Sequence, residues 1–187
     1  MMSATSSETA AEAKHLHKPR KHLRGKSMLD AIDLKILTFL QRDGRLSSAE
    51  IARKIGGLTK VAVSYRLKRL IQIGVLNGFF ARIDPETVGE SILFSTRLRI
   101  KSKGKKAERV ARRISQLRGV RSVFLTFGEY DALVIARAQD ARAVRDIVYA
   151  MYKAGDVLRS DTVVCHTVIK ESLDVALNDL RDRTLAV

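Results

Sequence analysis

The sequence predicts an α+β fold with two folded units, an N-terminal winged-type helix-turn-helix and a C-terminal ferredoxin-like βαββαβ domain. Between residues 29 and 73, apolar residues recur at helical spacing in three short segments. The pair Gly56-Gly57 separates the second segment from the third, and a short glycine turn between helices is typical of a helix-turn-helix. From residue 92 onward, strand-like and amphipathic helical segments follow one another in the ferredoxin-like order.

The first two helices are predicted from their apolar spacing and their polar first turns. Residues 29–40 place an apolar residue about every third or fourth position, with Asp30 and Asp33 where the helix dipole favours negative charge. A second helix of two to three turns begins after Ser47 or Ser48, either of which can cap it, and ends at the glycine pair.

The third helix is expected over Lys60–Ile73, between Thr59 as the N-terminal cap and Gly74 as the stop signal. At 100° per residue, Val63, Leu67 and Leu70 point to one side of this helix. The opposite arc holds Val61, Ser64, Tyr65, Lys68 and Arg69. A helix fits the major groove of B-DNA, so the outward residues are predicted to read base edges and the arginines and Lys68 to neutralise phosphates. The predicted DNA-contacting residues are Ser47, Thr59, Lys60, Val61, Ser64, Tyr65, Arg66, Lys68 and Arg69. An ordinary charged surface on a small helical bundle is the alternative.

A linker and a second unit follow. The linker, residues 77–90, is expected to hold a strand at 77–83 and a turn at Asp84-Pro85. The elements predicted after it are a strand at 92–100, a helix at 105–117, strands at 120–127 and 130–138, a helix beginning at Asp140, and a β-branched strand at 161–169.

This topology leaves one face of the sheet without helices, yet that face carries apolar residues. We therefore expect self-association through the second unit, residues 91–171. Isologous pairing would place two DNA-reading units together for a two-fold related site.

Composition excludes several classes of protein. The 187 residues include 35 Lys and Arg against 20 Asp and Glu, a net charge of +15, which favours a polyanionic partner such as double-stranded DNA. The single Cys165 cannot form a bridge within the chain, and neither a long apolar run nor a hydrophobic secretion signal is present. We expect a soluble, cytoplasmic protein with no membrane partner.

Two segments flank the folded units. Residues 1–27 are predicted to form a flexible arm that ends in a basic run, His15–Lys26, which either lies against phosphates or simply keeps the protein soluble. Residues 172–187 form a C-terminal extension.

Nothing in the sequence supports catalysis or a metal site. It contains no Gly-rich phosphate loop, nucleophile motif or cofactor fingerprint, so we expect no enzyme activity and no cofactor. Three of the four histidines fall in the flexible arm, and Cys165 and His166 point to opposite sides of a strand, so no metal site is expected.

Residues 91–119 contain ten basic residues and only one acidic residue. Within this segment, the basic cluster from Arg97 to Arg113 has two interpretations. It is either a solvated helix face or a surface that DNA touches when it wraps around a higher oligomer.

Several motifs together resemble the Lrp/AsnC (leucine-responsive, feast/famine) family of transcription factors over about residues 28–171. They are Leu29-Asp30-Ala31-Ile32-Asp33, Leu67-Lys68-Arg69-Leu70, Gly74-Val75-Leu76, Ile83-Asp84-Pro85 with Val88-Gly89, Thr126 to Asp131, and Thr162 to Lys170. The glycine pair adds one residue to the usual turn, and the N-terminal arm is longer than in most members.

The resemblance implies homodimers formed through the second domain, often assembled into octamers or other higher species. It also implies amino acids or related small molecules bound between dimers as effectors. The residues that correspond to the family's effector pocket are Gly128, Glu129, Tyr130, Asp131, Ser160, Asp161 and Thr162. Two alternatives stay open for Asp131, which either accepts the ammonium group of an amino acid or caps backbone amides beside a turn.

The sequence thus predicts a sequence-specific DNA-binding transcriptional regulator. In this interpretation an effector acts by favouring one arrangement of the dimers. A chromosome-organising protein with little sequence preference and no effector is the main alternative. A small-molecule binding subunit of a metabolic enzyme is less compatible with the basic helix.

Overall fold

The computed structural model describes residues 29–172, 174, 175 and 177. The described part of the chain forms two compact units, and the chain passes from the first to the second between Arg82 and Ile83. The described residues from Ser172 onward belong to the helical unit. The predicted N-terminal arm and most of the C-terminal extension lie outside the described residues. No helix in the described part of the chain is long and apolar enough to cross a membrane.

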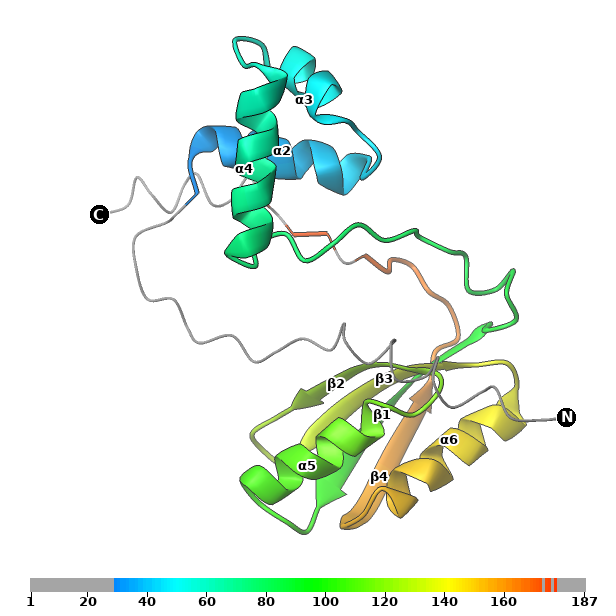
Figure 1. Ribbon diagram of the computed structural model, residues 1–187. Coiled ribbons are helices and arrows are strands. Elements are labelled where there is room, and N and C mark those ends of the chain that lie inside the picture. The colour runs from blue at the N-terminus through cyan, green and yellow to red at the C-terminus, as the bar shows by residue number, and fades with distance from the viewer. Residues whose placement is uncertain (1–28, 173, 176, 178–187) are drawn as a thin grey trace, which may run out of the picture. The chain divides into compact units, whose positions relative to one another are not determined.

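The first unit contains the three predicted helices, α2 (Ala31–Arg42), α3 (Ser48–Ile55) and α4 (Lys60–Gln72) (Figure 1). Polar side chains cap each start, because the first N–H groups of a helix have no partner within it. Asp30 and Asp33 form a reciprocal capping box on α2, and Ser47 and Glu50 form a second one on α3. The Thr59 hydroxyl accepts the Ala62 amide at 3.1 Å on α4.

Apolar side chains from all three helices form the core of this unit. Ile36, Ile51, Val63 and Leu70 are fully buried and lie at its centre. The C-terminal extension adds to this unit, because Leu177 packs against the same cluster and the Gln41 side-chain amide donates to the Val175 carbonyl at 3.2 Å.

The second unit is an antiparallel four-stranded sheet in the order β2-β3-β1-β4, with both helices on one face (Figure 1). Its elements follow the predicted βαββαβ order: β1 (Ile92–Ile100), α5 (Lys105–Ile114), β2 (Val120–Leu125), β3 (Ala132–Ala138), α6 (Ala141–Lys153) and β4 (Val157–Val164). The predicted ferredoxin-like fold is therefore confirmed.

The helix-covered face of the sheet holds the core of this unit. Alternate residues of β1 and β3, such as Leu98 and Val134, are fully buried against Ile114 of α5 and Met151 of α6. Gly119, before β2, has φ +84°, and a Cβ there would lie 2.5 Å from the Arg137 carbonyl oxygen, so this close approach requires glycine.

Two strand predictions need correction. Residues 77–83 do not form a strand, since they pair with no strand among the described residues and a lone strand leaves its backbone groups unpaired. The last strand spans Val157–Val164 instead of 161–169. Pairing with β1 sets this register, with Arg99 opposite Arg159 and Phe94 opposite Val164, so the β-branched residues after 164 extend past the paired segment.

The face of the sheet opposite the helices carries apolar side chains in the positions between the buried ones. Leu93, Leu133 and Ile135 are half-buried there, whereas Phe124 and Val163 are exposed. No helix of this unit covers them, as expected from the sequence (Figure 1).

Candidate DNA-binding interface and effector loop

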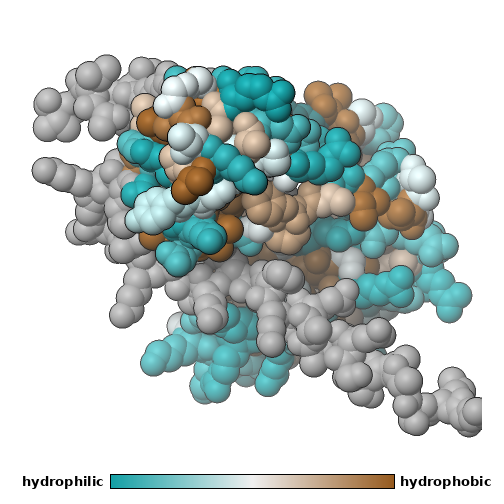
Figure 2. Space-filling model, turned by 45° about the horizontal axis from the view of Figure 1, so that its top comes forward, coloured by the Kyte–Doolittle hydropathy of each residue, from teal (hydrophilic) through white to brown (hydrophobic). Residues whose placement is uncertain are grey.

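The outer side of α4 is a solvent-exposed surface with both apolar and cationic side chains. Val61 and Tyr65 are 77% and 71% exposed, Lys60 and Lys68 are exposed, and Ser64 is half-buried. In Figure 2, exposed apolar side chains occur as small groups between hydrophilic ones on the visible described surface. The apolar and cationic side chains on the outer side of α4 can contact both the base edges and the phosphates of a DNA groove.

Arg66 and Arg69 turn toward α2 instead. Arg66 Nη1 donates to Asp33 Oδ1 at 2.8 Å and to Asp30 Oδ2 at 2.6 Å, and Arg69 Nη2 donates to Asp33 Oδ2. The Asp33 side chain is completely buried, and both arginines are partly buried. This placement corrects the expected outward orientation of Arg69, because a long side chain can fold back along the helix to reach a buried carboxylate.

The electrostatics of Asp30 fit this arrangement. Burial raises the pKa of Asp30, but hydrogen bonds from the Asp33 amide and the Arg66 guanidinium outweigh that effect and hold the pKa below its usual value. The carboxylate is therefore charged at neutral pH and available to Arg66.

The hydroxyls of Ser47 and Thr59 cap the starts of α3 and α4, the two helices joined by the turn. Between them, Gly56 and Gly57 both adopt left-handed backbone conformations, with φ of +74° and +69°. Two consecutive left-handed residues strongly favour glycine, so the pair occupies this turn without steric strain. That Ser47 and Thr59 also contact DNA stays a prediction.

The predicted effector residues form two groups on either side of β1. Gly128, Glu129, Tyr130 and Asp131 lie in the loop from β2 to β3, and Ser160, Asp161 and Thr162 lie in the middle of β4 instead of at its start. Leu98 of β1 pairs with Ala132 on one side and with Ser160 on the other, so both groups lie at the same level of the sheet.

Asp131 has structural partners of its own. Its carboxylate accepts the Ile100 amide at 2.8 Å and pairs with the Lys103 ammonium. These interactions, with that of Lys103 the largest, hold the pKa of Asp131 below its usual value. Of the two roles considered for Asp131, the structure shows the carboxylate binding a backbone amide.

Strand alternation divides the β4 group between the two faces of the sheet. Ser160 accepts the Tyr152 hydroxyl of α6 at 3.0 Å, and Thr162 lies 3.1 Å from the buried Thr96, so both point toward the helices. Asp161 points to the open face, where it pairs with Arg97. The structure therefore does not bring all seven residues to one place within a single chain.

Arg97 links the two groups and was not among the predicted effector residues. Besides its ion pair with Asp161, its guanidinium lies 4.8 Å from the centre of the Tyr130 ring, in the range of a cation–π interaction. The alternation of apolar and polar residues along 92–100 indicates that Arg97 points away from the core. Its partners depend on how β1 pairs with the strands on either side, which the sequence pattern does not give.

Within the described part of the chain, no group of three His, Cys, Asp or Glu side chains could hold a metal ion. Cys165 and His166 follow β4, and Cys165 is exposed and free. The histidines of the N-terminal arm lie outside the described residues.

A capped trihelical unit with an exposed outer helix, joined to a ferredoxin-like domain, defines a class of DNA-binding regulators. Residues 29–71 match the AsnC-type helix-turn-helix domain, and residues 96–175 match the Lrp/AsnC ligand binding domain. The FL11 transcriptional regulator of Pyrococcus furiosus is 31% identical over 150 residues, which cover 80% of this chain and 97% of that protein. The LrpA regulator of Pyrococcus horikoshii is 31% identical over 146 residues, 78% of this chain and 99% of that protein. The chain belongs to the Lrp/AsnC family of transcriptional regulators, which are not enzymes.

Solved structures agree with this assignment. A transcriptional regulator from Neisseria meningitidis in complex with L-methionine superposes with a TM-score of 0.74 at 28% identity, covering 81% of this chain and 99% of that one. A feast or famine regulatory protein from Mycobacterium tuberculosis complexed with L-methionine gives a TM-score of 0.71 at 27% identity, covering 79% and 98% of the two chains.

Proposed function

We propose that this protein is a sequence-specific DNA-binding regulator in which the outer side of α4 reads the major groove. The observation that carries this proposal is the exposure of Val61, Tyr65 and Lys68 on a helix whose start is capped and whose middle is tied to α2. A rigid helix with exposed groups near its N-terminal half can present them to base edges in a fixed register.

Within this proposal the arginines of α4 have a different role from Lys68. Arg66 and Arg69 act as positioning residues, because Asp30 and Asp33 already neutralise them. Lys60 and Lys68 are left to contact phosphates, and Val61, Ser64 and Tyr65 to contact bases. Ser47 and Thr59 cap their helices and contact the DNA backbone beside them.

The second proposed element is a homodimer formed through the open face of the sheet, with higher assembly such as an octamer. The apolar side chains on that face, among them Leu133 and Ile135, favour burial against a second copy. A dimer would present two α4 helices to a two-fold related DNA site in the cytoplasm, where such a regulator would act.

The third element is an amino acid effector, for which L-methionine is the first candidate because it is bound in two structural relatives. We propose that the loop from Gly128 to Asp131, together with Arg97 and Asp161, contributes to its site. Ser160 and Thr162 then support the site from the helix side of β4. The effector would alter DNA binding only to the extent that it binds two dimer arrangements with different affinity.

The test is selection of bound fragments from the source genome, followed by competition at fixed salt between a selected fragment and random duplex. The regulator proposal predicts that the selected fragment binds about a thousandfold more tightly or better. A ratio near one would instead favour the chromosome-organising alternative. Repeating the selection with L-methionine, and with D-methionine as the matched control, tests the effector.

A further inference from the structure

We propose that the outer side of α5 is a second DNA-binding surface that contacts the phosphate backbone without reading sequence. The α5 basic surface consists of Lys105, Lys106, Arg109, Arg112 and Arg113. This proposal rests on the proposed function, because DNA held by α4 is the duplex that this surface would contact.

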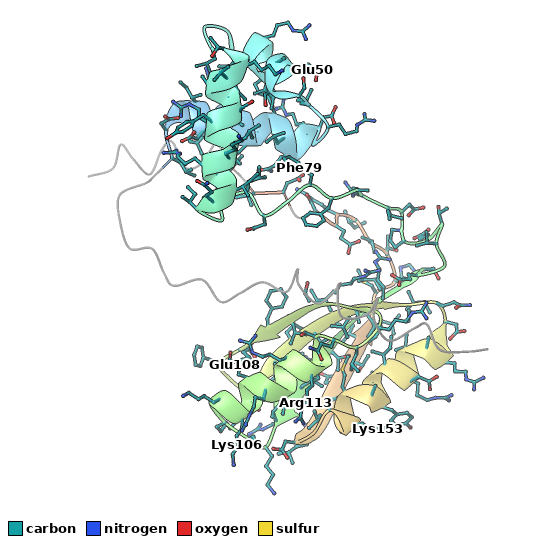
Figure 3. All side chains as sticks on the ribbon, viewed as in Figure 1. Glu50, Phe79, Lys106, Glu108, Arg113 and Lys153 are labelled. Atoms are coloured by element: carbon teal, nitrogen blue, oxygen red, sulfur yellow. The ribbon has the colours of Figure 1, made fainter. Side chains whose placement is uncertain are left out.

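The cations of the α5 basic surface are concentrated on the exposed side of one ten-residue helix. All five side chains are exposed, and Glu108 is the only carboxylate on the helix. Figure 3 shows Lys106, Glu108 and Arg113 along α5 in the helical layer of the sheet domain. By contrast, the apolar residues of α5, such as Val110 and Ile114, are all buried in the core beneath.

Few neighbouring carboxylates neutralise this surface. Arg112 pairs with Glu108 one turn earlier, and Arg113 donates to the Ala154 carbonyl at 3.3 Å. Within the described part of the chain, Lys105, Lys106 and Arg109 have no carboxylate within ion-pair distance. Three positive charges thus face solvent within the first five residues of the helix. Their mutual repulsion is unfavourable unless an anion lies against them.

The chemistry of this side of α5 distinguishes DNA from a protein partner. A protein interface needs an apolar centre that excludes water, and this side of the helix offers no exposed apolar side chain. A helix of this length spans about 15 Å, and duplex DNA of the same length carries roughly nine phosphates. The charges therefore match a phosphate backbone, which Lys and Arg contact without sequence preference.

The test compares the full chain with a variant that combines Lys105→Gln, Lys106→Gln and Arg109→Gln. The control combines Arg142→Gln, Arg145→Gln and Lys153→Gln on α6, which removes the same net charge from exposed positions of the other helix. Affinity is measured against salt for a duplex of about two helical turns, enough for α4, and for one of about eight turns. Circular dichroism and light scattering establish folding and assembly for each variant.

On the long duplex, the slope of log affinity against log salt should be smaller in magnitude by about two to three for the α5 variant. Each lost phosphate contact accounts for close to 0.9 of this change. On the short duplex the slope for the α5 variant should match that of the unmodified chain, and the α6 control should change little on either. A charge-retaining variant, Lys105→Arg, Lys106→Arg and Arg109→Lys, should bind like the unmodified chain.

If the α5 variant matches the α6 control on the long duplex, the surface is only solvated and the proposal is wrong. Failure of the proposed function has a different signature. In that case Lys68→Gln would leave short-duplex binding unchanged, whatever the α5 variant does on the long one.

Discussion

The Asp33 carboxylate in the first turn of α2 accepts a hydrogen bond from Arg66 Nη1 of α4 at 2.8 Å, and the Asp33 side chain is completely buried. The other oxygen of the same carboxylate accepts the Arg69 guanidinium. One buried acid thus fixes two arginines of the candidate recognition helix. This relationship shows that the cations of α4 are not equivalent: Arg66 and Arg69 are tied to α2, whereas Lys68 is exposed and is the cation that we propose for phosphate contact.

Replacing Asp33 should destabilise the helix-turn-helix unit strongly. In Asp33→Ala both arginines lose a buried partner, and we expect a loss of about 3 kcal/mol in the free energy of unfolding. The midpoint of urea unfolding measures this loss. The matched control is Asp43→Ala, which removes an exposed ion pair and a backbone hydrogen bond with Arg45 and should leave the midpoint nearly unchanged. Equal midpoints for the two variants would refute the positioning role.

Lys68 and Arg66 should give opposite phenotypes. Lys68→Ala should leave the unfolding midpoint nearly unchanged and lower the magnitude of the salt slope of DNA binding by about one. Arg66→Ala should lower the midpoint, because Asp30 and Asp33 lose their shared donor. A stable Arg66→Ala protein whose only defect is a reduced salt slope would show that Arg66 contacts phosphate after all.

Acid should weaken both units through carboxylates whose pKa values are held low. A group with a lowered pKa in the folded state contributes stability above its unfolded pKa, and that contribution is lost as the pH falls through the folded value. For Asp30 and Asp131 the loss therefore begins near pH 3.8, the ordinary value of an aspartate, and is complete below the folded pKa. Unfolding followed by circular dichroism between pH 6 and 2 should show a smaller acid loss for Asp131→Asn than for the unmodified chain. Parallel curves would contradict this assignment.

The helix-free face of the sheet should decide assembly. Leu133→Lys places a charge among apolar side chains on that face without entering the core beneath. The dissociation constant of the proposed dimer should therefore rise at least about tenfold. Sedimentation velocity measures this shift. Gln116→Lys, an exposed position after α5, adds the same charge and should leave the sedimentation coefficient unchanged. A Leu133→Lys protein that sediments like this control would place the interface elsewhere.

Arg97 should be required for effector binding but not for folding. Its ion pair with Asp161 is half-exposed, so Arg97→Ala should cost less than about 1 kcal/mol in stability. Loss of the contacts to Asp161 and Tyr130 should weaken binding of L-methionine at least about tenfold, as measured by calorimetry. Arg159→Ala, at another exposed position of the same sheet, is the control. Unchanged methionine binding in Arg97→Ala would remove this residue from the site.

The parts of the fold that were predictable depend on local signals. Thr59 begins α4 as expected, and Ser47, one of the two caps considered, begins α3, because capping involves residues only two or three positions away. Asp30 was expected in the first turn of its helix and caps it instead. The βαββαβ order was predictable from alternation and helical spacing, and Val61 and Tyr65 lie on the exposed side of α4 as the helical wheel indicates.

The errors involve partners far away in the sequence. A helical wheel gives the direction of the Cα–Cβ bond of Arg69 but not the buried Asp33 that draws its guanidinium back. The limits of β4 depend on pairing with β1, which composition does not encode. Strand alternation places Asp161 on the opposite face from Ser160 and Thr162, which is a local pattern. The contact of Asp161 with Arg97 depends on strand pairing and was therefore not predictable.

The most direct test of the account is the effect of Tyr65→Ala on the sequence selected from genomic DNA. Tyr65 is exposed on the outer side of α4 and contributes nothing to the buried core, so the variant should fold normally. We expect the unmodified chain to select a defined consensus and Tyr65→Ala to lose preference at one or more positions, each corresponding to about 1 to 3 kcal/mol. A folded Tyr65→Ala protein that selects the same consensus with the same preference would contradict the claim that this side of α4 reads DNA.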